Sequence, residues 1–203
     1  DTLKLFALNP QTGKKREVYT EHQQSWVEWI DQVTFLKKGK EFVLLTDRDG
    51  WMRLYHYGAD GTLLRQLTKG KWSVAALQTV DEKRGMVYFT AKKESPTRTD
   101  LYRVGLNGKG FERLTFGPYT HTVRVSPGGK CFSTTYSNAA TPSKMAVCRS
   151  GVGVLRELGD SKTDQFDLFA LAKTEVFTIP ASDGVALPAS WVLPVDFDPA
   201  KKY

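Results

Sequence analysis

The sequence predicts an all-β fold, a partial β-propeller of about four blades with four antiparallel strands in each. The first observation behind this prediction is a repeat in which each matched residue lies 47 positions from its twin. A fixed period of about 20–50 residues is typical of arrays of supersecondary units, and propeller blades repeat every ~40–50 residues. The matched residues are Leu54-Tyr55, Gly58, Gly61, Leu67-Thr68 and Gly70 in one copy, and Leu101-Tyr102, Gly105, Gly108, Leu114-Thr115 and Gly117 in the other.

The second observation is the composition of the segments between these copies. They are short, β-branched and aromatic, which favours pleated strands over helices, and the residues between them suit tight turns. No amphipathic helix of ordinary length is evident. A seven-stranded sandwich is the structural alternative, but it does not account for the repeat. The predicted strand pairs are 32–36 with 41–46, 77–80 with 85–90 and 122–125 with 130–136, and the predicted turns include Asp49-Gly50, Asp60-Gly61, Asn107-Gly108 and Gly128-Gly129.

Two degraded copies of the repeat extend the pattern to four units. The first contains Leu5-Phe6 and Thr12-Gly13, and the last contains 145–147 and Leu158. The first unit lacks a full complement of strands. Because open sheet edges are normally removed by closure of the ring, we expect either part of a larger propeller or self-association.

The end of the chain differs from the blades. Strands at 176–179 and 189–193 flank an Asp183-Gly184 turn, they are out of phase with the repeat, and a proline-rich segment follows them. The sequence therefore predicts two parts, with blades in residues 1–174 and a hairpin that begins a different domain in residues 175–203.

Composition excludes several classes of protein. With 203 residues, 40% hydrophobic, the chain can bury a core, and it has no apolar run of the ~20 residues that a membrane span requires. Asp1 opens directly into a strand-like segment, so no targeting segment is expected in this chain. The formal net charge of +7 suggests nucleic acid, but the basic residues are dispersed over predicted turns. We therefore expect no nucleic-acid partner.

The residues do not form a catalytic or metal-binding motif. A nucleophile elbow requires Gly-x-Ser-x-Gly, and Ser182 has Gly184 on one side but Pro180 on the other. We expect His22 to be solvated in a loop, His56 to lie on a strand face, and His121 to hydrogen-bond between blades. No two histidines are spaced as metal ligands, and Asp47-x-Asp49-Gly50 is interpreted as a turn rather than a calcium loop. We predict no catalytic residue, no metal and no cofactor.

The two cysteines, Cys131 and Cys148, fall on strands that we expect to pair as a hairpin. A cross-strand disulfide is geometrically possible for such a pair. Two free, half-buried thiols are the preferred interpretation.

Several motifs, in this order and spacing, resemble the prolyl dipeptidyl peptidases, serine exopeptidases of the dipeptidyl peptidase IV type. Residues 46–55 are similar to the family's Ser-Glu-x-Asp-Gly-aromatic-x-His-Leu-Tyr, with Asp47 where glutamate is usual and Arg53 where histidine is usual. Residues 67–74 match Leu-Thr-x-Gly-x-Trp-x-Val. Residues 183–203 are similar to the beginning of the family's α/β-hydrolase domain.

The resemblance implies that the chain is the C-terminal part of an eight-bladed propeller that caps an α/β-hydrolase domain. Family members remove X-Pro or X-Ala dipeptides from peptide N-termini. Their catalytic serine, aspartate and histidine, and the glutamates that bind the substrate amine, lie outside this chain by the alignment. The chain alone is therefore expected to be inactive. Its expected partners are peptide substrates, the hydrolase domain, upstream blades and, in the parent, a second copy; the expected location is the periplasm or outside the cell.

Four tryptophans can either line a binding rim or pack between blades, and packing is the preferred interpretation. The family's loop beginning at Trp26-Val27 can approach the substrate cavity, although Trp29, Ile30 and Asp31 depart from its usual residues. Trp26 and Trp29 are the candidate rim residues. The alternative function is a stand-alone binding or adaptor propeller, which has no need of the segment 183–203. The four tryptophans are Trp26, Trp29, Trp51 and Trp72.

Overall fold

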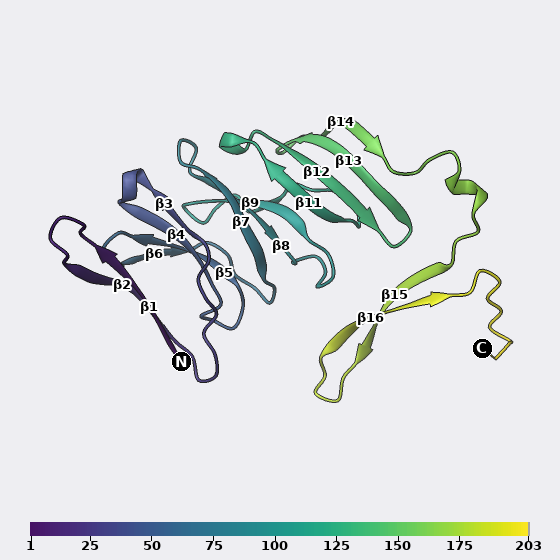
Figure 1. Cartoon of the computed structure of the whole chain (residues 1–203), viewed down its shortest axis with the longest axis horizontal. Helices are drawn as coiled ribbons and strands as arrows, with labels where there is room; N and C mark the ends of the chain where they lie inside the picture. Colours follow the sequence, from purple (N-terminus) through teal and green to yellow (C-terminus); the bar gives the residue numbers. More distant parts are fainter. Residues whose placement is uncertain (203) are drawn as a thin grey trace.

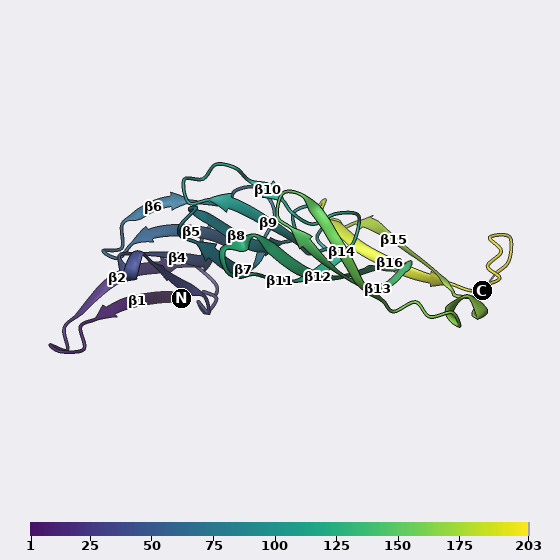
Figure 2. The same cartoon turned by 90° about the horizontal axis from the view of Figure 1, so that it is seen from above.

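The computed structural model describes residues 1–202 and, within them, five antiparallel sheets. Three sheets have four strands in sequence order, β3 to β6, β7 to β10 and β11 to β14, and two are hairpins, β1–β2 and β15–β16. The sheets follow one another in chain order along a curved row (Figures 1 and 2). This arrangement is a partial β-propeller with three complete blades and two strands of a fourth, as the sequence predicted.

The elements alternate with short turns throughout the described residues. Their helical structure consists of three 3₁₀ turns, and no helix in residues 1–202 is long and apolar enough to cross a membrane. The strands are β1 (Thr2–Leu8), β2 (Lys15–His22), β3 (Val33–Leu36), β4 (Glu41–Thr46), β5 (Arg53–Gly58), β6 (Leu63–Gln66), β7 (Val74–Asp81), β8 (Met86–Ala91), β9 (Asp100–Gly105), β10 (Glu112–Arg113), β11 (Thr120–Val125), β12 (Cys131–Asn138), β13 (Thr141–Arg149), β14 (Gly153–Asp160), β15 (Lys173–Pro180) and β16 (Ala186–Leu193), and the 3₁₀ turns are η1 (Lys37–Gly39), η2 (Pro127–Gly129) and η3 (Phe166–Leu168).

The connections gather at two opposite edges of the row of blades. Because each blade has four antiparallel strands, the chain leaves a blade at the edge where it entered. We call this edge, formed by residues 23–32, 67–73 and 114–119, the linker edge. The other edge, formed by the first and third turns of each blade, is the turn edge. The β15–β16 hairpin lies on the linker-edge side of the row (Figure 1).

The 47-residue repeat corresponds to one recurring turn between blades. In both copies the threonine hydroxyl accepts a backbone N–H from the third strand, Leu54 to Thr68 at 3.0 Å and Leu101 to Thr115 at 3.2 Å. The glycine two residues later has positive φ, and the next aromatic folds back over it. A Cβ at Gly70 would lie 2.5 Å from the Trp72 ring. A Cβ at Gly117, in the equivalent pair, would likewise lie 2.5 Å from the Tyr119 ring.

An arginine holds the carbonyl of this glycine in both blades, but from different strands. Arg53 on β5 donates to the carbonyl oxygens of Gly70 and Trp72. Arg113 on β10 donates to Gly117 at 2.6 Å and to the buried carboxylate of Asp100 at 2.7 Å. Asp100 occupies the repeat position of Arg53, so the charge is reversed there while the bond to the carbonyl is kept.

Apolar clusters between neighbouring sheets form the core. Leu54 and Phe89 belong to the cluster between the first and second complete blades, and Tyr88 and Phe132 to the cluster between the second and third. A third cluster, which includes Tyr19 and Phe42, joins the β1–β2 hairpin to the first complete blade. Each blade therefore depends on its neighbours for burial of its apolar faces.

Cys131 and Cys148 are free thiols. They lie on paired strands, β12 and β13, as predicted, but Cys131 is opposite Arg149 and Cys148 is opposite Phe132. Successive residues of a strand point to opposite faces of the sheet. The two thiols therefore lie on different faces, and the cross-strand disulfide left open by the sequence does not form.

The C-terminal hairpin is present, with Asp183-Gly184 in its turn, and its strands are longer than predicted. β15 begins at Lys173 and therefore crosses the predicted boundary at residue 175. Tyr203, the last residue of the expected hydrolase-like segment, lies outside the described residues.

Replacement of Gly129 by alanine should destabilise the fold far more than replacement of Gly85. The two glycines have nearly the same φ, +65° and +64°, but a Cβ at Gly129 would lie 2.1 Å from the buried Tyr88 ring, whereas Gly85 has open space. We expect a loss of about 1 kcal/mol for Gly85→Ala, from backbone strain, and about 3 kcal/mol or more for Gly129→Ala. Urea unfolding measures both; equal losses would contradict the packing described.

Candidate functional site

The segment of residues 23–32, which we call the tryptophan loop, connects β2 to β3 at the linker edge and is fixed at both ends. The amide of Gln23 donates to Glu21 at 2.7 Å and to Asp47 at 3.1 Å. At the other end, the side-chain oxygen of Gln32 accepts the backbone N–H of Leu77 at 3.0 Å, on β7 of the next blade. The loop is therefore held by β2, by the turn after β4 and by β7, which belong to three successive sheets.

The two tryptophans of this loop point outward. Trp26 is 66% exposed and Trp29 is 78% exposed. Val27 is buried, and Ile30 packs against the cluster that contains Tyr19. Inter-blade packing is confirmed for Trp72, which is buried, and is wrong for Trp26 and Trp29, because Val27 and Ile30 take the inward positions.

The sequence before Trp26 differs from that of the other two linkers. In those linkers an aromatic folds back over a glycine two residues before it, Gly70 before Trp72 and Gly117 before Tyr119. Gln24 stands two residues before Trp26, and the Trp26 ring is exposed to solvent.

A buried carboxylate supports the start of the loop. Glu21 accepts hydrogen bonds from the Tyr19 hydroxyl at 2.6 Å, the Thr46 hydroxyl at 2.5 Å and the Gln23 amide at 2.7 Å. Burial alone would raise the pKa of Glu21, but these hydrogen bonds and the charge of Arg48 outweigh burial and lower it. Glu21 is therefore an ionised, fully bonded anchor rather than a proton donor.

Arg48 joins this network among three tyrosines. Its guanidinium donates to the Tyr57 hydroxyl at 2.6 Å and lies 5.6 Å and 5.8 Å from the ring centroids of Tyr19 and Tyr55. Burial raises the pKa of the Tyr57 hydroxyl, although Arg48 opposes this shift, so the tyrosine stays neutral. No sequence motif indicated Arg48, Gln23 or Gln32. The Trp26-Val27 pair, which begins a loop of the family, was the one signal available for this segment.

The histidines lie in separate structural environments. His56 bonds to Glu41 at 2.9 Å on a strand, as predicted. His121 bonds to the Thr134 hydroxyl at 3.0 Å and to the Phe116 carbonyl at 2.9 Å in the linker between blades, and burial lowers its pKa. His22 is exposed on β2, not in a loop as expected. Within residues 1–202 no cluster of His, Cys, Asp and Glu is placed to hold a metal.

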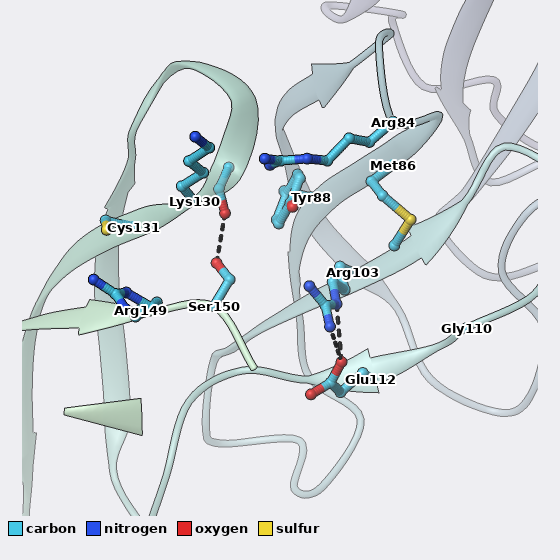
Figure 3. Close-up of a pocket in the computed structure, with 11 residues that line it drawn as sticks. Arg84, Met86, Tyr88, Arg103, Gly110, Glu112, Lys130, Cys131, Arg149 and Ser150 are labelled. Atoms are coloured by element: carbon cyan, nitrogen blue, oxygen red, sulfur yellow. Dashed lines mark hydrogen bonds and ion pairs between the residues drawn. The ribbon is translucent and has the colours of Figure 1, made fainter. Parts of the chain in front are cut away.

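The largest cavity described, about 810 Å³, lies between the second and third complete blades at the turn edge (Figure 3). Two of its cations are paired, because Arg103 bonds to Glu112 at 2.8 Å and Arg84 lies 3.4 Å from Asp81. Lys130 and Arg149 also line it, and no ion pair is described for them in residues 1–202. Cys131 lines the cavity without a histidine beside it. The cavity is therefore a gap between blades without catalytic chemistry, and the tryptophan loop is the better candidate site.

Comparison with known proteins gives a consistent picture. A family model described as the dipeptidyl peptidase IV (DPP IV) N-terminal region matches residues 1–143. Among curated proteins, dipeptidyl peptidase 4 of Trichophyton rubrum is 28% identical over 186 residues, covering 86% of this chain and 24% of that protein. Probable dipeptidyl-aminopeptidase B of Emericella nidulans is 31% identical over 222 residues, covering 100% of this chain and 24% of that protein. The chain thus spans about a quarter of the length of these relatives.

Two solved structures share the arrangement of the blades. The crystal structure of Porphyromonas gingivalis dipeptidyl peptidase 4 matches with a TM-score of 0.87 and 29% identity, over 98% of this chain and 29% of that one. A putative dipeptidyl aminopeptidase IV from Bacteroides ovatus matches with a TM-score of 0.85 and 25% identity, over 100% of this chain and 32% of that one.

Replacement of Glu21 by glutamine should destabilise the chain at neutral pH and much less in acid. We expect a loss of about 2 kcal/mol at pH 7, because three donors lose a charged acceptor. The pKa of Glu21 is lowered on folding, so its contribution is present above its unfolded pKa and lost as the pH falls through the folded one. The difference between wild type and variant should therefore shrink below about pH 4.5.

Urea unfolding at a series of pH values measures this difference. Glu28→Gln is the matched control, because Glu28 is exposed in the same loop and no side-chain hydrogen bond is described for it. A difference between wild type and Glu21→Gln that does not change with pH would contradict the role assigned to the ionised carboxylate.

Proposed function

This chain belongs to the family of dipeptidyl peptidase IV N-terminal regions, and from that premise we propose that it supplies the C-terminal blades of the propeller of a serine-type dipeptidyl peptidase. The intact enzyme would remove X-Pro and X-Ala dipeptides from peptide N-termini by acyl transfer to a serine outside this chain. The proposal includes an eight-bladed propeller, to which residues 1–174 contribute, and an α/β-hydrolase domain that begins with residues 175–203. Export from the cytoplasm and a homodimeric parent are inferred from the family alone.

The observation that carries the proposal is the C-terminal hairpin. The hairpin lies on the linker-edge side of the blades (Figure 1) and exposes apolar side chains from both of its strands. An isolated two-stranded hairpin is at best marginally stable in water, and exposed apolar surface of this kind marks an interaction site. A further domain packed on the hairpin would bury these side chains. They include Val176, Ile179, Leu187, Trp191 and Val192.

The tryptophan loop lies at the linker edge as well. In the proposed enzyme it would therefore face the space between propeller and hydrolase domain, where a peptide substrate has to lie. Trp26 and Trp29 would form part of the wall of that space and admit short or unstructured N-termini. The propeller would act by shape, since the chain contributes no catalytic residue in this proposal.

A stand-alone binding propeller is the second candidate. The observation in its favour is the exposure of Trp26 and Trp29 (66% and 78%), because an exposed aromatic surface can bind a partner without any catalytic residue. The exposed apolar side chains of the hairpin favour the peptidase.

A peptidase assay decides between the two functions. We expect the natural protein that contains residues 1–203 to hydrolyse Ala-Pro-p-nitroanilide and to lose this activity after treatment with a serine-directed fluorophosphonate. The 203-residue chain alone should be inert. A natural protein without turnover would leave the binding propeller as the function, and turnover by the isolated chain would contradict the absence of catalytic residues from it.

Substitution of Trp29 by alanine should test the place of the loop in this enzyme. We expect kcat/KM to fall roughly threefold to tenfold, mainly through KM, because an exposed aromatic contacts the substrate but not the reacting atoms. Val152→Ala is the control, since Val152 is similarly exposed (70%) but lies at the turn edge. An unchanged KM for Trp29→Ala would remove the loop from the substrate path.

A further inference from the structure

The tryptophan loop combines exposed aromatic rings with exposed carboxylates. Beside Trp26 and Trp29, the side chains of Glu28 and Asp31 are exposed, and residues 23–32 contain no lysine or arginine. The chain as a whole carries a formal charge of +7. The loop is therefore a locally acidic, aromatic surface on a basic protein.

The two carboxylates have no cation of their own. No ion pair or side-chain hydrogen bond is described for Glu28 or Asp31 in residues 1–202, whereas most other acidic groups of the blades are bonded, as with Glu41 to Lys37 at 2.6 Å and Glu112 to Arg103 at 2.6 Å. Glu21, the third acid near the loop, already accepts hydrogen bonds from Tyr19, Thr46 and Gln23. Glu28 and Asp31 are thus the free charges of this surface.

This combination matches one ligand chemistry. Indole faces attract ammonium and guanidinium groups and pack against their aliphatic stems, and carboxylates pair with the same groups. An anionic peptide would meet two unpaired carboxylates and be repelled. A purely apolar peptide would use the rings but leave the charges unmatched.

We propose that the tryptophan loop makes the protein selective for peptides that carry a lysine or arginine near the N-terminus. Trp26 and Trp29 bind the stem and the cationic head, and Glu28 and Asp31 supply the complementary charge. The inference rests on the proposed function for the location of the peptide. It adds which charge on the peptide the enzyme would favour. The anchors at Gln23 and Gln32 keep the four side chains outward, so the surface is preformed.

The test measures hydrolysis of matched proline peptides by the natural protein that contains residues 1–203. In one set, residue one, before the proline, is lysine, glutamine or glutamate. In the second set, the peptides begin with Ala-Pro, and residue three, after the proline, is lysine, glutamine or glutamate. We expect kcat/KM to be roughly threefold to tenfold higher for lysine than for glutamate in at least one set, with glutamine between them. The preference should weaken at 0.5 M salt, because exposed charges are screened.

Charge reversal assigns the preference to the loop. Glu28→Lys should reduce the lysine-to-glutamate ratio, and the double substitution Glu28→Lys and Asp31→Lys should invert it. Asp164→Lys is the matched control, because Asp164 is also exposed and changes charge by the same amount outside the loop. Equal ratios for lysine and glutamate, or equal effects of Glu28→Lys and Asp164→Lys, would overturn the proposal.

A binding measurement separates this proposal from the peptidase assignment. Calorimetric titration with Lys-Pro and Glu-Pro peptides measures affinity directly. The same protein is used, after inactivation by the fluorophosphonate if it hydrolyses the peptides and untreated if it does not. Tighter binding of the lysine peptide that is lost in the double variant supports the charge selectivity even if no hydrolysis occurs. Equal affinities in a protein that does hydrolyse Ala-Pro-p-nitroanilide would overturn the selectivity and leave the peptidase intact.

Discussion

Burial of sheet faces between neighbouring blades is the constraint on which the rest of this structure depends. β4 shows it most directly, because Phe42 and Leu44 enter the cluster with the β1–β2 hairpin while Val43 and Leu45 enter the cluster with the next blade. A sheet that is apolar on both faces cannot stand alone in water and needs a neighbour on each side. The glycines beneath Trp72 and Tyr119 serve the same stacking, since they let the linkers lie close to the sheets they join.

The number of strands per blade then decides where function can lie. Four antiparallel strands return the chain to the edge at which it entered, so every linker and the C-terminal hairpin reach the same side. At the opposite edge, Gly129 of η2 lets Tyr88 pack closely, and ion pairs such as Arg103 with Glu112 line the cavity between blades. The tryptophan loop, with ten residues, is the longest of the three linkers that form the linker edge.

The sequence predicted the blades because their causes are local. The 47-residue period, the turn glycines and the β-branched segments each act over a few residues, and the strands followed them closely. Other features depend on partners that are distant in sequence. Cys131 and Cys148 were placed on the right strands, yet a register offset of one residue put them on opposite faces. Trp26 and Trp29 were expected to pack, because aromaticity alone does not reveal which side chain of a linker turns inward. The surroundings of Glu21 required strands from two sheets.

The repeat also shows what is held constant in such a chain. Arg53 and Asp100 occupy the same repeat position with opposite charge, yet the glycine carbonyl of each linker is bonded by an arginine, because Arg113 supplies the group that Asp100 lacks. A departure from a motif is thus harmless when a neighbour restores the interaction. The tryptophan loop has no such glycine, since Gln24 stands two residues before Trp26, and the Trp26 ring is exposed. No ion pair or side-chain hydrogen bond is described in residues 1–202 for the neighbouring Glu28 and Asp31, so the charge selectivity that we propose depends on the linker that differs most from the repeat.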